Sequence, residues 1–384
     1  MKVSIVINCF HYAAYVGQAL RSALAQTWPD TEVIVVDDGS IDGSREVIEA
    51  ILASGTRGRA LVKPNGGQGS AYNAGFAAAS GDIVLFLDAD DWLYPEAAER
   101  IAAAWAPGVS KVQFQLEVVG ADGRSRGRHV PSEMHDHEAL ALVSRFGSYG
   151  TPPGSGNAYS AEFLRQVLPM EERPWRIAAD SVPILLAPAY GRVVSLREPF
   201  GAYRVHRPDG DDSLLFNNAP RGLWAEFERV QRCQALVISH LKRLNRRVRC
   251  PLLLAPWDAR LVALCLRFGG RPGAGAEAAD APDGPDAPDV PHTPDVPRTP
   301  GAAPVPGAPA VRATPEVSAD SPRRWPRWRL ARWALQSLWQ WPGLGPVMKL
   351  VQSLWMMSLW LLPAPLARPI GRLDRLFKGA PSGA

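Results

Sequence analysis

Three aspartates stand within four positions at the end of a strongly apolar run. The run is Ile83–Leu87, and Asp88, Asp90 and Asp91 follow it. A short, wholly apolar run predicts a buried strand, so these carboxylates are expected at the edge of a sheet. Carboxylate oxygens there suit Mg²⁺ or Mn²⁺, which keep some water and share other coordination positions with phosphates. An isolated Asp-x-Asp is more often a solvated acidic turn, and the preceding segments decide between these interpretations.

The segments before these acids alternate between strand and helix patterns. Strands are predicted at Val3–Ile7, Glu32–Val36, Ala60–Val62 and Ile83–Leu87, and helices at Tyr15–Ala25, Ile41–Leu52 and Ala71–Ala79. This alternation predicts βαβ units and a mostly parallel sheet, with a ligand crevice at the carboxyl ends of the strands. Asp37 and Asp38 directly follow the second strand. Both acidic clusters are therefore expected to converge on one site.

Further strands and helices are predicted as far as residue 245. Val112–Leu116 is expected to form a strand that is antiparallel or at the sheet edge, and Gly150–Gly156 a flexible loop. Asp180–Ala189 has a helical pattern, because Pro183 is tolerated in a first turn. The remaining predicted elements are a strand at Val193–Leu196, an extended segment at Phe200–Val205 and a mostly helical segment at Leu214–Asn245.

The composition limits the classes of protein that need to be considered. The net charge of +4 over 384 residues does not by itself indicate nucleic acid. The four cysteines lack the pair spacing of a zinc site, so we expect reduced thiols in the cytosol. Residues 1–10 fit a first strand and lack the cleavage site of a signal peptide. The catalytic part is therefore expected to stay in the cytoplasm.

The last third of the chain differs in composition from the rest. Residues 269–322 contain Ala-Pro-Asp repeats that cannot bury a core, so we expect a disordered linker. Residues 323–384 are basic and apolar, and seven of the 13 tryptophans lie there. The expected organisation is an α/β domain at 1–206, a helical extension at 207–268, the linker at 269–322 and an amphipathic tail at 323–384.

Six short motifs occur in order along residues 1–206. They are Val3-Ser4-Ile5-Val6-Ile7, Val35-Val36-Asp37-Asp38-Gly39-Ser40, Lys63-Pro64-Asn65-Gly66-Gly67, Asn73-Ala74-Gly75, Leu87-Asp88-Ala89-Asp90-Asp91 and Tyr203-Arg204-Val205-His206. Together they resemble the family 2 glycosyltransferases of GT-A fold, a Rossmann-like α/β fold with helices on both faces of a mostly parallel sheet. The resemblance implies metal-dependent transfer, usually with inversion, of a hexosyl or N-acetylhexosaminyl group from a nucleotide diphosphate sugar to a hydroxyl acceptor. It also implies a divalent metal, Mn²⁺ or Mg²⁺, and a place in polysaccharide or other cell-surface glycan synthesis.

The resemblance also implies roles for the aspartates of the donor site. Asp88 and Asp90 would hold the metal, and Asp88 would also contact the ribose. Asp37 or Asp38 would accept a hydrogen bond from the base. Breaking the anomeric bond leaves a nucleoside diphosphate with extra negative charge, which a bound divalent cation stabilises.

Two further donor-site candidates have a structural alternative. The turn from Asn65 to Gly67 would let the backbone approach the donor closely, or it would be only a tight turn. His206 would reach the diphosphate or the metal, although a solitary histidine is more often structural. Asn8-Cys9-Phe10 departs from the family motif, where a proline followed by a polar or aromatic pair is usual. This departure leaves the contacts to the nucleotide base open.

Inversion by a single displacement needs a general base on the acceptor hydroxyl. In the family an acid that opens a late helix, often in a Glu-Asp pair, has this role, and Asp180 matches it. Ala179 stands where the preceding acid is usual. The alternative is that Asp180 only caps its helix. Ala179 also leaves open a different class of function, a catalytically inactive, membrane-tethered protein that binds sugar nucleotides or acts as a scaffold.

The tail mixes cations with aromatic residues at helical spacing. Arg323–Arg329 begins this pattern. Leu350–Ala367 is almost uncharged but marginal for a full membrane span, and it fits an interfacial or re-entrant segment better. We therefore expect a helix in the interface of an anionic membrane, with the protein peripheral on the inner face of the cell membrane and a lipid-linked acceptor as a hypothesis. The alternative is an arm that docks on the catalytic domain or on a protein partner.

Two other functions fit the sequence less well. A dinucleotide oxidoreductase is disfavoured because no Gly-x-Gly-x-x-Gly follows the first strand. Binding of nucleic acid by the tail would be strongly salt-dependent, and we do not expect a nucleic-acid partner.

Overall fold

The computed structural model describes residues 1–206, 220–268 and 322–370, with gaps at 54, 56, 249, 323–324, 364–365 and 368–369. The predicted linker at 269–322 lies outside the described residues except for its last position. Residues 207–219, at the start of the predicted helical extension, and 371–384, at the end of the tail, also lie outside them.

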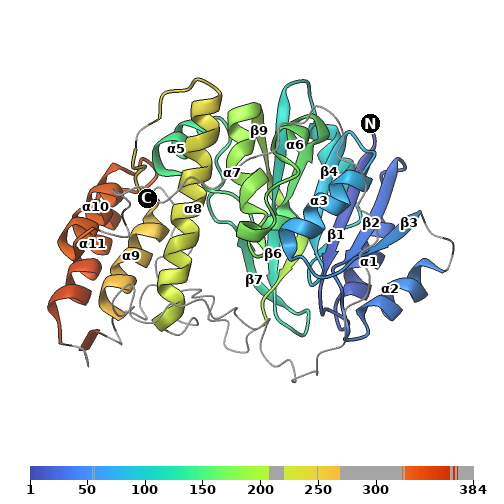
Figure 1. Cartoon of the computed structure of the whole chain (residues 1–384), viewed down its shortest axis with the longest axis horizontal. Coiled ribbons are helices and arrows are strands. Elements are labelled where there is room, and N and C mark those ends of the chain that lie inside the picture. Colours follow the sequence, from blue (N-terminus) through green and yellow to red (C-terminus); the bar gives the residue numbers. More distant parts are fainter. Residues whose placement is uncertain are drawn as a thin grey trace.

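A nine-stranded mixed sheet forms the centre of the α/β part (Figure 1). The strands are β1 (Val3–Cys9), β2 (Thr31–Asp37), β3 (Gly58–Val62), β4 (Ile83–Asp88), β5 (Trp92–Leu93), β6 (Val109–Val119), β7 (Ser125–Val130), β8 (Asn157–Ser160) and β9 (Arg192–Arg204). Their order is β3-β2-β1-β4-β8-β6-β9-β5, and β7 pairs with β6. The first four strands in this order are mutually parallel. The α/β prediction is therefore confirmed, and the parallel pairing is strongest in the amino-terminal half.

The second half of the sheet contains antiparallel pairs because β8 enters between β4 and β6 in the opposite direction to both. The predicted strand at Val112–Leu116 is part of β6, and its antiparallel pairing is confirmed. Its alternative placement at the sheet edge is wrong, since β6 also pairs with β9. The loop predicted as flexible at Gly150–Gly156 ends in a buried 3-10 turn, η1 (Gly154–Gly156), which packs against β4, β6 and β9.

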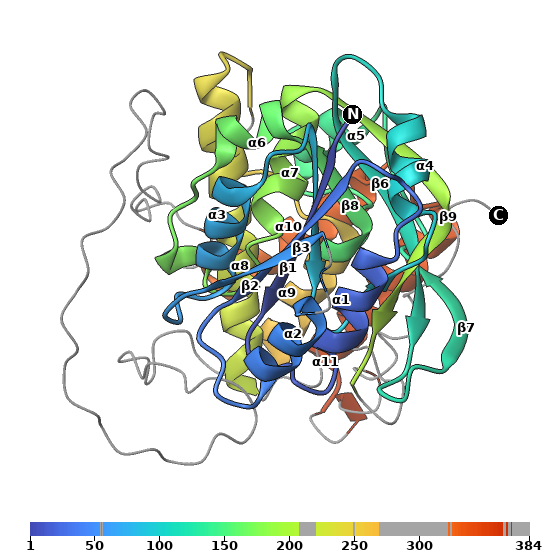
Figure 2. The same ribbon diagram turned by 90° about the vertical axis from the view of Figure 1, so that its right-hand side faces the viewer.

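Seven helices of the amino-terminal part cover the two faces of the sheet. They are α1 (Val16–Leu24), α2 (Ser44–Leu52), α3 (Gln68–Ala78), α4 (Ala97–Ala104), α5 (Ala139–Phe146), α6 (Ala161–Val167) and α7 (Ser181–Tyr190). Successive strand residues point to opposite faces, so Val6 belongs to one hydrophobic cluster while Ile5 and Ile7 belong to the other. Residues of α1, α2 and α4 join the second cluster, and residues of α3, α5, α6 and α7 join the first. Figure 2 shows α3 on one side of β1 and α1 on the other.

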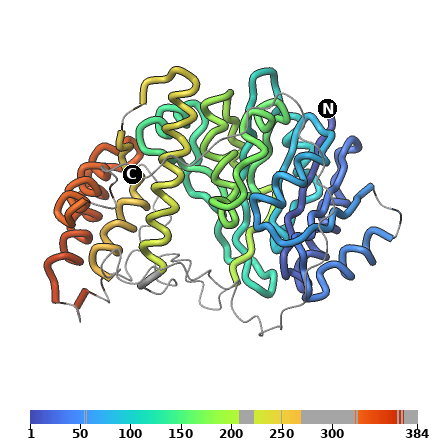
Figure 3. Tube along the Cα trace, in the orientation of Figure 1, coloured from blue at the N-terminus to red at the C-terminus, as the bar shows by residue number. Residues whose placement is uncertain are grey.

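Four more helices extend the first cluster away from the sheet. They are α8 (Pro220–Arg243), α9 (Pro256–Phe268), α10 (Arg327–Gln340) and α11 (Pro346–Leu361). Helix α8 packs on α7, α9 packs on α8, and both α10 and α11 contact α9. Figure 3 shows the trace of α10 and α11 beside that of α9, at the end of the molecule opposite α2 and β3. Among the described helices, none combines the length and the apolar content that crossing a bilayer requires.

Candidate active site

The ends of three parallel strands bring the two predicted acidic clusters to one edge of the sheet. Strand β1 lies between β2 and β4, and its register places Cys9 opposite Asp37 and Asn8 opposite Asp88. Apolar side chains of the strands are buried on both faces, so only the strand ends present polar side chains here. This is the edge at which open α/β sheets bind ligands.

Asp37 and Asp38 are buried, and both carboxylates accept hydrogen bonds from the protein. Asp37 accepts bonds from the backbone N–H of Ser40 at 3.0 Å and from Arg45 Nε at 3.3 Å. These bonds fix the turn between β2 and α2. Asp37 is thus a supporting residue of the strand end.

Asp38 fastens the glycine turn that follows β3. Its carboxylate accepts bonds from Lys63 Nζ at 2.6 Å and from the backbone N–H groups of Gly66 at 3.0 Å and Gly67 at 2.7 Å. Gly67 has a φ of +84°, and an added Cβ would lie 2.7 Å from Arg176 Cα, so a side chain at this position would be strained and would clash. The turn therefore packs directly against the segment that leads into α7.

Gln68 connects the segment that leads into α7 with the end of β4. Its Oε1 accepts the backbone N–H of Ala179 at 2.8 Å, and its Nε2 lies 3.5 Å from Asp88 Oδ1. Arg176 strengthens the same junction, because its carbonyl accepts the Gln68 backbone N–H at 2.8 Å and its Nη2 donates to Asn65 Oδ1 at 2.6 Å. The glycine turn, β4 and the start of α7 thus form one hydrogen-bonded unit.

Asp88 is the most electrostatically perturbed of the predicted site residues. Burial at the strand end, the neighbouring charge of Asp90 and the charge of Asp180 raise its pKa to about 7, although Asn8 Nδ2 donates to its Oδ1 at 2.9 Å. A carboxylate that is destabilised by neighbouring carboxylates gains from a bound cation. A divalent metal bound at this position would offset the repulsion between these carboxylates.

Asp90 lies beside His206, the last residue described before the gap at 207–219. His206 Nε2 is 2.7 Å from Asp90 Oδ2, and the two side chains are 40% and 15% exposed, so both reach the surface of the site. The His206 ring contacts Tyr15 edge-on with centroids 5.0 Å apart, and Tyr12 lies on the same side. Burial and the charge of Asp90 raise the pKa of Tyr12, which keeps its hydroxyl neutral.

Asp91, the third aspartate of the motif, points inward and holds the site together. It is buried and accepts a hydrogen bond from Ser155 Oγ at 2.6 Å and another from the backbone N–H of Arg204 at 2.9 Å. Burial and the charges of Asp90 and Asp88 raise its pKa well above the ordinary value. Asp91 thus joins β4 to η1 and β9.

Asp180 and Asp88 both lie beside Gly154. An ideal Cβ on Gly154 would lie 3.5 Å from Asp180 Oδ2 and 3.5 Å from Asp88 Oδ2. Burial raises the Asp180 pKa, while the positive charge of Arg229 on α8 lowers it. Asp180 directly precedes α7, and a hydrogen bond from the backbone N–H of Ser181, the first residue of that helix, also lowers its pKa. Ala178 lies two residues before Asp180, and its φ of 60° is unusual for a residue with a side chain. The backbone that leads to Asp180 is therefore strained.

Asp88, Asp90 and His206 fit a divalent cation by their chemistry. Carboxylate oxygens and an imidazole nitrogen are donors that Mn²⁺ accepts, and the mutual repulsion of Asp88 and Asp90 favours a cation between them. In the described part of the chain these three do not place their ligand atoms within 4.8 Å of one another. Such an arrangement is consistent with a metal that takes most of its ligands from water and phosphate.

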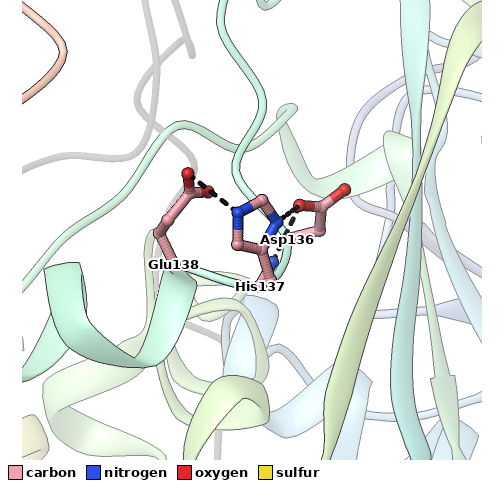
Figure 4. Close-up of side chains that lie close together, drawn as sticks. All are labelled: Asp136, His137 and Glu138. Atoms are coloured by element: carbon pink, nitrogen blue, oxygen red, sulfur yellow. Dashed lines mark hydrogen bonds and ion pairs between the residues drawn. The ribbon is translucent and has the colours of Figure 1, made fainter.

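One compact group of possible metal ligands occurs elsewhere among the described residues. Asp136, His137 and Glu138 are consecutive and lie near the surface (Figure 4). His137 is 83% exposed, and its two ring nitrogens are 2.7 Å and 3.1 Å from the carboxylates of Asp136 and Glu138. These contacts form an exposed ion-pair network, and we assign no function to it.

The structure adds Gln68, Gly154, Ser155 and Arg204 to the residues predicted from sequence. Gln68 directly follows the glycine turn, and Arg204 lies inside the last motif. Their closeness to motif residues in the sequence could have identified both as site residues. Arg204 is 5% exposed and donates to Gln18 Oε1 at 2.7 Å and to the Asp90 carbonyl at 2.9 Å. Gly154 and Ser155 reach the site only through tertiary packing, and no sequence pattern identifies them.

Comparisons with known proteins relate the amino-terminal part of the chain to a family. The model of glycosyl transferase family 2 matches residues 4–168. Residues 4–168 belong to glycosyl transferase family 2. The matched residues include the aspartates at the ends of β2 and β4, whereas Asp180 and His206 lie beyond them.

The relatives of this chain include proteins from several bacteria. An uncharacterized glycosyltransferase of Nostoc sp. is 35% identical over 54% of this chain and 65% of its own length. The succinoglycan biosynthesis protein ExoO of Rhizobium meliloti is 40% identical over 56% of this chain and 63% of its own length. The chain thus spans just under two thirds of these relatives. Among solved structures, Staphylococcus aureus TarS in complex with UDP-GlcNAc has a TM-score of 0.49 and 21% identity, covering 70% of this chain and 71% of that chain.

Proposed function

We propose that the chain is a metal-dependent, inverting glycosyltransferase. It would transfer a hexosyl or N-acetylhexosaminyl group from a nucleotide diphosphate sugar to a hydroxyl acceptor. The observation that carries the proposal is that Asp180 and Asp88 both lie beside Gly154, while His206 contacts Asp90 at the same strand end. Family 2 membership of residues 4–168 supports the reaction class.

Asp88, Asp90 and His206 would hold Mn²⁺ or Mg²⁺ together with the donor diphosphate. A divalent cation there neutralises the negative charge that the leaving diphosphate gains as the anomeric bond breaks. His206 is suited to this position because its Nε2 already contacts Asp90. The protein groups thus orient the diphosphate and keep it at the strand ends.

The nucleoside part of the donor would lie along the glycine turn. Asn65 and Gly67 present backbone at this edge, and Asp38 holds that backbone in place through three hydrogen-bond donors. Asp37 supports the same strand end. The direct contacts that the sequence predicts, from Asp37 or Asp38 to the base and from Asp88 to the ribose, remain part of this proposal.

Asp180 would act as the general base. Its pKa is raised by burial, so the carboxylate binds a proton more readily than an ordinary aspartate and suits removal of a proton from an acceptor hydroxyl. The acceptor oxygen would attack the anomeric carbon from the Asp180 side while the diphosphate leaves on the Asp88 side, which inverts the configuration. Ala179 carries no carboxylate and is buried in the core, so Asp180 is the acid available at the start of α7.

The acceptor would belong to a cell-surface glycan or its lipid-linked precursor. The relative from Rhizobium meliloti, named as a succinoglycan biosynthesis protein, supports a polysaccharide product. We place the reaction in the cytoplasm at the inner face of the membrane. The inactive scaffold is the less favoured alternative, because a carboxylate with a raised pKa lies near Asp88 and suits a general base.

The test is nucleotide release from a panel of UDP-, GDP- and dTDP-sugars, with Mn²⁺, with Mg²⁺ and with a chelator. Wild type is compared with Asp90→Asn and Asp180→Asn. Asp30→Asn, which changes a 55% exposed carboxylate before β2, is the matched control. We expect metal-dependent release of one nucleotide by wild type and the control, and at least a hundredfold slower release by the two site variants. Equal release with and without metal, or no release from any donor in the presence of lipid-linked acceptors, would contradict the proposal.

A further inference from the structure

Helix α11 is apolar on two opposite faces. Trp355, Met356 and Leu359 are buried in the cluster that joins it to α9. The outer face carries a second apolar stripe, and its largest members are Val347 at 74%, Leu350 at 51%, Val351 at 44%, Leu354 at 52% and Leu361 at 82% exposure. Spacings of three, four and seven residues place these side chains on one face. Docking of α11 on the helical extension explains the inner face, and the outer face has no partner among the residues that the structure describes.

Helix α10 also carries exposed apolar side chains. Trp328 and Trp339 are 66% and 50% exposed, and with Leu335 and Arg332 they line a shallow, mostly apolar groove along the outer side of the helix. Tryptophans with one exposed edge are typical of the boundary between water and lipid. In Figure 1, α10 and α11 form the end of the molecule farthest from β3 and α2, so the surface faces away from the sheet.

The charges of this segment have a single sign. Residues 325–363 contain the cations Arg327, Arg329, Arg332 and Lys349 and no aspartate or glutamate. A second copy of the same face would bring these like charges together in a symmetric dimer, which is unfavourable. An anionic lipid surface accepts both the cations and the apolar side chains.

We propose that the outer face of α10 and α11 docks in the plane of an anionic lipid bilayer. The exposed leucines and Trp328 and Trp339 enter the boundary between headgroups and acyl chains, while the arginines and Lys349 contact the headgroups. The inner face stays packed on α9, so the whole chain is held at the surface without a span. The sequence left open whether the tail lies on a membrane or docks on the protein. In this proposal the inner face of the tail docks on the protein and its outer face docks on lipid.

The test is flotation of the full chain with vesicles of phosphatidylcholine alone and of phosphatidylcholine with 30% phosphatidylglycerol, roughly the range in which anionic surface charge attracts basic segments. The main variant is Leu350→Glu with Leu354→Glu, which changes two half-exposed positions of the stripe. The matched control is Ala103→Glu with Gln166→Glu, which adds the same charge at exposed positions of α4 and α6. Thermal unfolding of all three proteins checks that the fold is retained.

We expect wild type and the control to float with the anionic vesicles and to bind the neutral ones more weakly. Each leucine that enters the acyl boundary contributes about a fivefold to tenfold factor in binding, so the double variant should bind at least about 25-fold more weakly. Raising the salt concentration should also weaken binding. Equal flotation of the double variant and wild type would overturn the proposal. The proposal would also be overturned if wild type formed a dimer, the double variant were monomeric, and neither protein bound vesicles.

Discussion

Replacing Gly154 with alanine places a methyl group beside both acids on which the proposed chemistry depends. The added Cβ would lie 3.4 Å from Asp180 Cβ and 3.5 Å from the Oδ2 atoms of both Asp180 and Asp88. These are ordinary van der Waals distances, so the fold should accept the methyl group with a change in unfolding free energy of less than about 1 kcal/mol. The space beside both carboxylates, however, becomes smaller.

The expected loss of activity follows from the distances of proton transfer. An acceptor oxygen must approach the base to about 3 Å, and a methyl group 3.5 Å from the same carboxylate oxygen displaces it by a fraction of an ångström to about 1 Å. A displacement of about 1 Å costs on the order of 100-fold in rate, or about 3 kcal/mol of activation free energy. The assay is kcat for sugar transfer, with KM for the donor measured in parallel.

Gly345→Ala is the control for this variant. Gly345 precedes α11 at a φ of −63°, and an added Cβ there meets nothing within 4 Å. We expect Gly345→Ala to keep wild-type kcat and Gly154→Ala to lose about two orders of magnitude at an unchanged unfolding temperature. If folded Gly154→Ala retained more than half of the wild-type kcat, the reaction would not take place between Asp88 and Asp180.

Three further outcomes are expected. Gln68→Met should lower the unfolding free energy by about 1–3 kcal/mol, because the backbone N–H of Ala179 loses its hydrogen-bond acceptor. Denaturant titration measures this change, and an unchanged unfolding midpoint would show that Gln68 does not bridge the two segments. Burial in α9 raises the pKa of Asp258 to about 7, so the folded protein holds the carboxyl proton more tightly than the unfolded chain does. The resulting stabilisation of up to about 4 kcal/mol is present below pH 4 and is lost as the pH rises towards 7. The unfolding temperature of wild type should therefore fall more between pH 5 and pH 8 than that of Asp258→Asn, and parallel curves would contradict this. Mn²⁺ with the correct nucleoside diphosphate should raise the unfolding temperature of wild type by several degrees and leave that of Asp90→Asn unchanged, as a thermal shift assay would show.

The sequence was informative wherever a residue's position follows from local pattern. The apolar run Ile83–Leu87 predicted a buried strand, and parallel βαβ units then bring its carboxyl end to the same sheet edge as that of β2. Asp37, Asp38, Asp88 and Asp90 were therefore predictable as neighbours of one another. Asp180 was recognisable only through family resemblance, since its spacing from the other acids carries no local signal.

The remaining features depend on contacts between distant segments. Strand β6 became an interior strand because β8 and β9 pair with its two edges, and no pattern within β6 specifies those partners. Gly154 looked like part of a flexible loop, yet η1 is buried against β4 through the bond from Ser155 to Asp91. The amphipathic pattern of α11 predicted an apolar face, while only the packing on α9 shows that a second apolar face remains outside.

Binding of Mn²⁺ in the presence of a nucleoside diphosphate tests the central claim most directly. The signal of free Mn²⁺ in an electron paramagnetic resonance spectrum falls when the ion is bound, and it can be measured with UDP, GDP and dTDP in turn. We expect one of these diphosphates to cause tight Mn²⁺ binding by wild type and by Asp30→Asn, and none to do so with Asp90→Asn. Retention of the free signal by wild type with all three diphosphates, or equal binding by Asp90→Asn, would contradict a metal-dependent donor site at the end of β4.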